Sequence, residues 1–153
     1  MKKINSISFK KAMGKFVTGV TVISINSNNI YVGKTVNSFA SLSLNPPLVL
    51  FSLDKKSFSL TKFKKSKFIG INFLSNKQKN LSTHFANKKK WGSTKFFLSK
   101  NNVPMIEKSI VNLNCQNIKT MPSGDHIIFI CKVSELHINK SLKPLIYLKN
   151  KYV

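Results

Sequence analysis

Short runs of β-branched and aromatic residues, separated by turn-forming residues, constrain this fold more than any other feature of the sequence. The first two runs flank Asn26-Ser27-Asn28-Asn29, which is typical of a hairpin turn. Helical patterns are few and do not alternate regularly with the strands, which favours an antiparallel barrel over a doubly wound parallel sheet. The predicted strands cover residues 20–25, 30–36, 48–53, 67–74, 109–119 and 126–138.

A few segments have apolar residues at helical spacing. Ser8 is the expected N-cap of a helix at residues 9–16, whose apolar face is expected to cover the sheet. Residues 57–64 predict a short helix or turn, and residues 75–85 predict a helix capped by Ser75. Polar loops are expected at 88–90 and 99–102.

The length and composition suit one domain, which we expect to span residues 1–153, because a 153-residue chain that is 42% hydrophobic can bury a sufficient core. Cys115 and Cys131 lie in apolar runs without metal-ligand spacing, which predicts two buried free thiols and no metal site. No apolar run approaches the length of a membrane span, and the first residues lack the apolar segment of a signal peptide. We therefore expect a cytoplasmic protein without a membrane partner.

The charge is strongly positive, with 26 basic residues against 4 acidic ones and a formal net charge of +22. Such an excess is typical of nucleic-acid-binding proteins. Every basic residue is Lys, however, and Arg is the residue whose planar fork suits phosphates and guanine. The lysines are spread over predicted turns and helix exteriors, and Lys, Asn and Ile share A/T-rich codons. We expect no specific nucleic-acid partner, and a basic barrel that binds single strands is the alternative.

Motifs of the common enzyme classes are absent from the sequence. It contains no glycine-rich dinucleotide motif, no phosphate loop and no zinc-protease motif, and its four scattered acids offer no carboxylate pair. If the chain is an enzyme, a cofactor is expected to supply the chemistry. Polar clusters do follow three of the predicted strands, at residues 34–38, 52–57 and 72–78.

The residues of these clusters, and their order along the chain, resemble those of the short-chain flavin reductase family, which includes the reductase components of two-component flavin monooxygenases. Thr35-Val36-Asn37-Ser38 and Gly124-Asp125-His126 belong to the resemblance, which runs nearly from end to end. It implies a mainly β fold: an antiparallel split β-barrel of the Greek-key, FMN-binding type with a few covering helices. The matching segments are residues 12–23, 35–49, 72–78, 124–130 and 144–147.

The resemblance also implies a flavin site. Thr35, Asn37 and Ser38 are expected to donate to the flavin's carbonyl oxygens and ring nitrogens, because preorganised donors stabilise the charge that develops on reduction. The clusters at 52–57 and 72–78 are expected to hold the ribityl chain and phosphate. From the residues alone, the same side chains would be read as turn and cap residues. The implied cofactor-binding residues are Thr35, Val36, Asn37, Ser38, Ser52, Leu53, Ser57, Asn72, Phe73, Leu74 and Gln78.

His126 is the expected catalytic residue, because the resemblance places it beside the flavin where the nicotinamide stacks. We expect it to position the substrate, with proton supply as the alternative role. The implied activity is an NAD(P)H:flavin oxidoreductase that binds FMN, with FAD as the alternative flavin and NADH or NADPH as reductant. The implied partners are a second copy of the chain, as a homodimer, and a monooxygenase. The competing hypothesis is a flavin-binding electron carrier or store without reductase activity.

Overall fold

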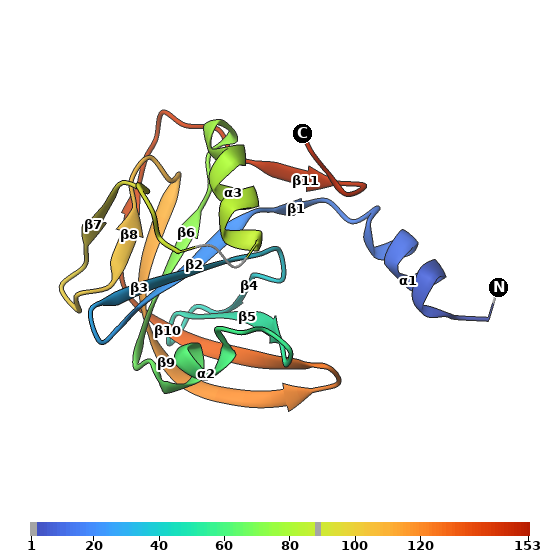
Figure 1. Cartoon of the computed structure of the whole chain (residues 1–153), viewed down its shortest axis with the longest axis horizontal. Helices are drawn as coiled ribbons and strands as arrows, with labels where there is room; N and C mark the ends of the chain where they lie inside the picture. Colours follow the sequence, from blue (N-terminus) through green and yellow to red (C-terminus); the bar gives the residue numbers. More distant parts are fainter. Residues whose placement is uncertain (1–2, 88–89) are drawn as a thin grey trace.

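The computed structural model describes residues 3–87 and 90–153, so the predicted loop at 88–90 lies mostly outside the described residues. Seven strands form the largest sheet: β2 (Thr21–Ser27), β3 (Ile30–Val36), β4 (Ala40–Ser43), β5 (Leu48–Asp54), β6 (Phe68–Phe73), β9 (Val111–Ser123) and β10 (His126–Ile138). Their order is β3-β2-β6-β9-β10-β5-β4, and neighbouring strands are antiparallel (Figure 1). The prediction of a mainly β, antiparallel fold is confirmed.

Smaller elements complete the structure. Two minor sheets pair β1 (Thr18–Gly19), β11 (Ile146–Leu148) and β12 (Lys151–Tyr152) in one, and β7 (Phe96–Leu98) with β8 (Pro104–Ile106) in the other. The helical segments are α1 (Ser6–Met13), α2 (Leu60–Lys65), the short 3-10 helix η1 (Asn76–Gln78) and α3 (Lys79–Ala86). Strands β1, β4, β7, β8, β11 and β12 were not expected from the sequence.

The first predicted hairpin is confirmed. Ser27 pairs with Ile30, so the turn consists of two residues, Asn28 and Asn29. Both have positive φ, 53° and 64°, as a type I′ turn requires, and Asn tolerates this conformation better than most residues. The turn therefore fixes the register that pairs β2 with β3.

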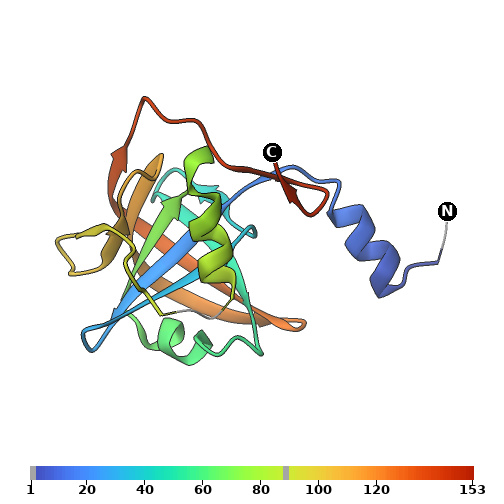
Figure 2. The same ribbon diagram turned by 45° about the horizontal axis from the view of Figure 1, so that its top comes forward.

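The large sheet curls on itself but does not close through hydrogen bonds (Figure 2). Strands β3 and β4 are its two edges, and no ladder joins them within the described residues. The long β9–β10 hairpin has register shifts near Cys131 and near Val133, and such irregularities bend a strand pair. One half of β10 consequently pairs with β5, from Leu48 to Asp54, while the other half extends beyond it.

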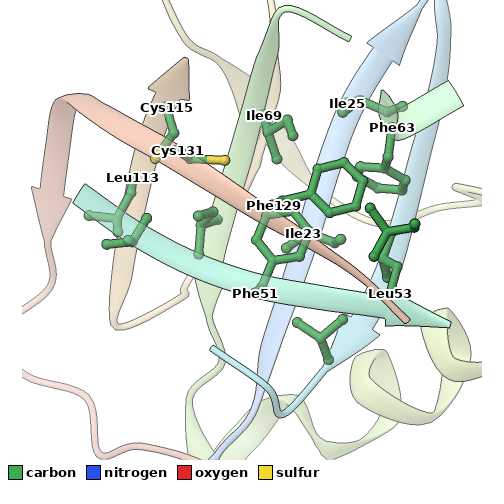
Figure 3. Close-up of a cluster of buried hydrophobic side chains, with 14 of the residues drawn as sticks. Ile23, Ile25, Phe51, Leu53, Phe63, Ile69, Leu113, Cys115, Phe129 and Cys131 are labelled. Carbon is green, nitrogen blue, oxygen red and sulfur yellow. The ribbon is translucent and has the colours of Figure 1, made fainter. Parts of the chain in front are cut away.

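Strand β2 is buried on both faces, because two separate clusters of apolar side chains cover it. Ile23 points into the cluster inside the curled sheet, where Phe51 and Phe129 stack with ring centroids 4.8 Å apart (Figure 3). Cys115 and Cys131 lie in the same cluster as free thiols, as predicted. Burial raises the pKa of Cys131 to about 12, which keeps this thiol neutral at ordinary pH.

The second cluster lies between the sheet and α3. Phe85 of α3 is fully buried in this cluster together with Val22 of β2. The helix approaches β3 closely at Gly33, where an added Cβ would lie 2.6 Å from ring atoms of Phe85. Because any larger residue at Gly33 would displace this ring, the glycine allows α3 to cover the sheet.

Helix α1 does not cover the sheet, contrary to the sequence prediction. None of its residues is buried, and it projects away from the rest of the molecule (Figures 1 and 2). Its N-cap is Asn5 and not Ser8: the amide of Ser8 donates to Asn5 Oδ1 at 2.8 Å, and Asn5 N donates to Ser8 Oγ. No helix in the described ranges has the length and apolar character that a membrane crossing needs.

A buried carboxamide on β6 joins the two layers of the structure. Asn72 Nδ2 donates to the Val22 carbonyl at 2.9 Å and to Ser24 Oγ at 3.0 Å, both on β2. Asn72 Oδ1 accepts from the amide of Ile106 on β8 at 2.9 Å and from Asn112 Nδ2 on β9 at 2.8 Å. All four hydrogen-bonding positions of this side chain are therefore used inside the protein.

Replacing Asn72 with Ala is expected to lower the free energy of unfolding by at least about 3 kcal/mol, because several buried polar groups lose their partner at once. Urea denaturation followed by circular dichroism measures this loss. Asn80, which is exposed, is the matched control, and Asn80→Ala is expected to leave the unfolding midpoint nearly unchanged. Equal midpoints for the two variants would contradict the assigned role of Asn72.

Candidate functional site

The first polar cluster lies at the end of β3, beside a small cavity of about 200 Å³. Thr35, Val36 and Asn37 form one wall of this cavity. The opposite walls come from α3 and from the C-terminal hairpin of β11 and β12. The residues that complete the lining are Val20, Ser82, Ala86, Tyr147 and Tyr152.

Ser82 holds the walls of this cavity together. Its carbonyl accepts the hydroxyl of Thr35 at 2.7 Å, and its own hydroxyl lies 2.8 Å from that of Tyr152. Lys79 of the same helix lies over the Tyr152 ring, 5.6 Å from the centroid. Strand β3, α3 and the C-terminal hairpin are thus fixed relative to one another around the cavity.

Ser38 lies just before β4 begins, and its side chain extends the contact with β5. Its hydroxyl accepts from the amide of Ser52 at 3.0 Å and donates to the carbonyl of Ser52 at 3.1 Å. The ladder between β4 and β5 begins at Ala40, which pairs with Leu50. The Ser38 side chain therefore supplies the two hydrogen bonds that a longer β4 would have made, and it places the first and second polar clusters side by side.

Donors remain unused in the bend between β3 and β4. The backbone amides of Asn37 and Ser38 and the carboxamide of Asn37 have no acceptor among the described residues. Polar groups that lack a protein partner need water or a ligand. Neutral donors of this kind match the carbonyl oxygens and ring nitrogens of an isoalloxazine, so the residues present here fit a flavin.

His126 begins β10 and lies opposite Asp54 of β5. Its Nδ1 lies 2.7 Å from Asp125 Oδ1, which leaves Nε2 facing outward without a partner among the described residues. The hydrogen bond and the charge of His126 lower the pKa of Asp125. The ammonium of Lys55 donates to the Gly124 carbonyl and fixes the turn that carries both residues. A hydrogen bond on Nδ1 fixes the ring, so that Nε2 can contact a substrate.

The second polar cluster surrounds the end of β5. Leu53 is buried in the core, so only its backbone is available to a ligand, and the same holds for Val36. Ser57 lies in the turn after β5, with its hydroxyl 3.2 Å from that of Ser59. Lys55 and Ser57 are each hydrogen-bonded through their backbone amides, to Asp125 and Asp54 respectively, which joins this turn to the His126 turn.

The third polar cluster does not face the cavity. The side chain of Asn72 is saturated within the core, as described above, and Leu74 is also buried there. Phe73 contacts the first cluster indirectly, because its ring packs edge-on against Phe39 with the centroids 4.7 Å apart. The side chain of Gln78 accepts from the amide of Ser75 and donates to the Glu107 carbonyl, away from β3. Binding of flavin by this cluster stays a prediction, and the geometry gives these side chains structural partners.

The sequence matches a known protein family over nearly its whole length. The sequence profile of the flavin reductase-like domain matches residues 13–153. The chain belongs to the flavin reductase-like family. It is 37% identical over 130 residues to an FMN reductase (NADH) of Agrobacterium fabrum, covering 84% of this chain and 75% of that protein. It is 34% identical over 144 residues to the reductase subunit of a flavin-dependent monooxygenase of Mycobacterium tuberculosis, covering 93% of this chain and 77% of that one.

The family also includes proteins of known structure. The native state of flavin reductase PheA2 superposes on this chain with a TM-score of 0.92 and 38% sequence identity, covering 98% of this chain and 97% of the other. Ser82 and Tyr152 were not expected as site residues, because neither lies in a segment that carried the resemblance. Tyr147 does lie in such a segment, residues 144–147, and that position was the available signal.

Ser38→Ala is expected to lower the free energy of unfolding by about 1–3 kcal/mol, because both backbone groups of Ser52 lose their partner in a half-buried place. Urea denaturation measures the change. Ser41→Ala, an exposed hydroxyl on the neighbouring strand, is the control and is expected to have almost no effect. A loss as large in the control would remove the special role of Ser38.

Proposed function

We propose that this chain is an NAD(P)H:flavin oxidoreductase that binds FMN, with FAD as the alternative, and supplies reduced flavin to a partner monooxygenase. The observation that carries the proposal is the family match over residues 13–153, combined with unused donors at the Asn37 bend. The relatives named above, an NADH-dependent FMN reductase and a monooxygenase reductase subunit, support it. We further propose that the curled sheet is the split β-barrel of the Greek-key, FMN-binding type.

The residues of the proposed flavin site have different roles, which follow from the chemistry of their side chains. A bound flavin would accept a hydride from the nicotinamide and so carry both electrons of the reaction. The Asn37 carboxamide and the Asn37 and Ser38 amides donate to the pyrimidine edge, where negative charge develops. Thr35 and Ser52 hold these donors in place through their bonds to Ser82 and Ser38. Because these groups are fixed before the reaction, they stabilise the charge without reorganisation.

His126 and the turn after β5 occupy the rest of the proposed site. His126 Nε2 orients the nicotinamide, since hydride transfer depends strongly on the distance and alignment of the two rings. Ser57 and the ammonium of Lys56 hold the flavin phosphate, as hydroxyls and lysines commonly do. The cytoplasmic location and the single domain over residues 1–153 stay predictions.

Oxidation of NADH and NADPH with added FMN, FAD and riboflavin tests the activity. We expect absorbance at 340 nm to fall only when a flavin is present, and flavin fluorescence to be quenched on binding. Quenching without oxidation of either nicotinamide would replace the proposal with the electron carrier or store. Absence of both signals would exclude a flavin function altogether.

His126→Ala is expected to lower kcat/KM for the nicotinamide by about tenfold or more, mainly through KM, because the ring positions the substrate. Flavin quenching is expected to be unchanged. His137→Ala is the control, since His137 lies far along the same strand and contacts Phe97. Equal kinetics for wild type and His126→Ala would remove His126 from the site.

We also propose a homodimer, and the apolar surface of α1 supports it. Ile7, on a helix without a buried residue, is 79% exposed, and Phe16, in the bend after this helix, is 73% exposed. Contiguous exposed apolar surface of this kind is typical of an interface between subunits. The other large apolar residues exposed in this region are Ile4, Phe9, Met13 and Val17.

Phe9→Asp is expected to shift the molecule from dimer to monomer in sedimentation-velocity experiments, because a carboxylate cannot enter an apolar interface without a large desolvation penalty. Ile30→Asp is the control: Ile30 is 58% exposed, beside the β2–β3 turn and away from α1. Dissociation by both variants, or by neither, would contradict an interface formed by α1.

A further inference from the structure

A large cavity lies on the other side of α3 from the proposed flavin site. Its volume is about 810 Å³, within the range of ligand pockets for nucleotide-sized molecules. It is bounded by η1 and α3, by residues 93–95, by the turn at 107–108 and by the loop at 139–142. No residue lines both this cavity and the one beside Thr35.

Helical periodicity explains why the two cavities are separate. Each residue of an α-helix is rotated by about 100° from the one before it. Asn80 and His84 therefore lie on one face of α3, and Ser82 and Ala86 lie on the opposite face. The first pair lines the large cavity, and the second pair lines the proposed flavin pocket.

The walls of the large cavity are fixed by hydrogen bonds between them. Gln78 Nε2 donates to the Glu107 carbonyl at 2.8 Å, which ties the start of α3 to the turn after β8. The amide of Glu107 donates to the Lys95 carbonyl at 3.1 Å, and the amide of Asn76 donates to the Lys143 carbonyl at 2.9 Å. The cavity is therefore a built feature of the fold and not a gap between loose loops.

Charged and polar groups in this cavity have no protein partner. Lys77, Lys95 and Lys108 come from three different walls, and none of their ammonium groups has a hydrogen bond, ion pair or ring contact among the described residues. The hydroxyl of Ser75, a fully buried lining residue, is also without a partner. Glu107 is the lining carboxylate, so the lysines outnumber the acidic groups. Three ammonium groups and a buried hydroxyl suit a ligand with several anionic oxygens.

The imidazole ring of His84, which is held by other residues, also lines the cavity. His84 Nε2 lies 2.7 Å from the Lys90 carbonyl, and the imidazole packs edge-on against Phe85 with the centroids 4.8 Å apart. The imidazole lines the cavity, and aromatic bases can contact such a ring by stacking. Leu81 and Leu142 add apolar surface to the same cavity.

We propose that this cavity binds an organic phosphate of nucleotide size, with its phosphates among Lys77, Lys95 and Lys108 and its ring against His84. The site goes beyond the proposed reductase activity, because it lies on the opposite face of α3 from the residues that line the Thr35 cavity. It does include Gln78, which the resemblance implied as a flavin-binding residue, so experiment must distinguish the two ligands.

Isothermal titration with ADP at near-physiological salt tests the site, because salt screens non-specific attraction to a basic surface. The variant K77Q/K95Q/K108Q removes the three ammonium groups. K62Q/K64Q/K65Q is the matched control, since it removes three lysines from α2 and so changes the net charge equally. We expect the cavity variant to bind ADP about tenfold more weakly or worse, and the control to stay within about twofold of wild type.

Further titrations separate the proposed ligand from simpler anions and from the flavin site. Adenosine and inorganic phosphate are each expected to bind more weakly than ADP, and ADP is expected to leave the FMN quenching curve unchanged. Equal weakening in the control variant would show attraction to the overall charge, and competition between ADP and FMN would place ADP in the flavin site. Either result overturns the proposal. The cavity variant keeps its NADH:FMN turnover if the reductase function holds, so the two proposals fail separately.

Discussion

The carboxamide of Asn72 is the interaction on which the arrangement of layers depends. It lies on β6, an interior strand of the large sheet, and its four bonds reach β2, β8 and β9. Because β8 otherwise pairs only with β7 among the described strands, the bond from the Ile106 amide fixes the small sheet against the large one. The turn after β8 then reaches Gln78, and through it the start of α3. The Asn72 carboxamide thus helps to position the helix that separates the two cavities, together with the bonds from Ser24 to the Pro104 carbonyl and from Asn112 to the Ile106 carbonyl.

The proposed flavin site arises from an incomplete strand. β4 begins at Ala40, so β5 has an unpaired edge that the Ser38 hydroxyl satisfies at Ser52. The chain between β3 and β4 is therefore free of ladder bonds, and its amides point at no protein acceptor. A longer β4 would pair these groups and leave nothing for a ligand. The donor set follows from where the sheet ends, which is a property of the fold more than of any one side chain.

The sequence predicted those elements whose structure depends mainly on residues close to one another in the chain. The Asn28-Asn29 turn and the strands around it follow from the sequence, because turn chemistry fixes their register. The position of α1 could not be predicted in this way: an apolar helical face indicates burial against something, and the sequence does not say against what. Asn72 and Gln78 show the same limit, since a carboxamide in a polar cluster suits a ligand and a buried network equally well. Ser82 and Tyr152 are far apart in the sequence and come into contact only in the folded chain, so no local pattern indicated them.

The order of strands in the large sheet has a consequence for how the chain folds. The β2–β3, β4–β5 and β9–β10 hairpins can each form from residues that are close in the sequence. The pairing of β5 with β10 instead joins residues far apart in the sequence, such as Ser52 and Ile128. Closing such long loops slows folding. Until β10 pairs with β5, Phe51 lacks the Phe129 ring on which it stacks, and exposed apolar strand edges promote aggregation. The β4–β5 hairpin is therefore the part of this chain most exposed to misassembly during refolding.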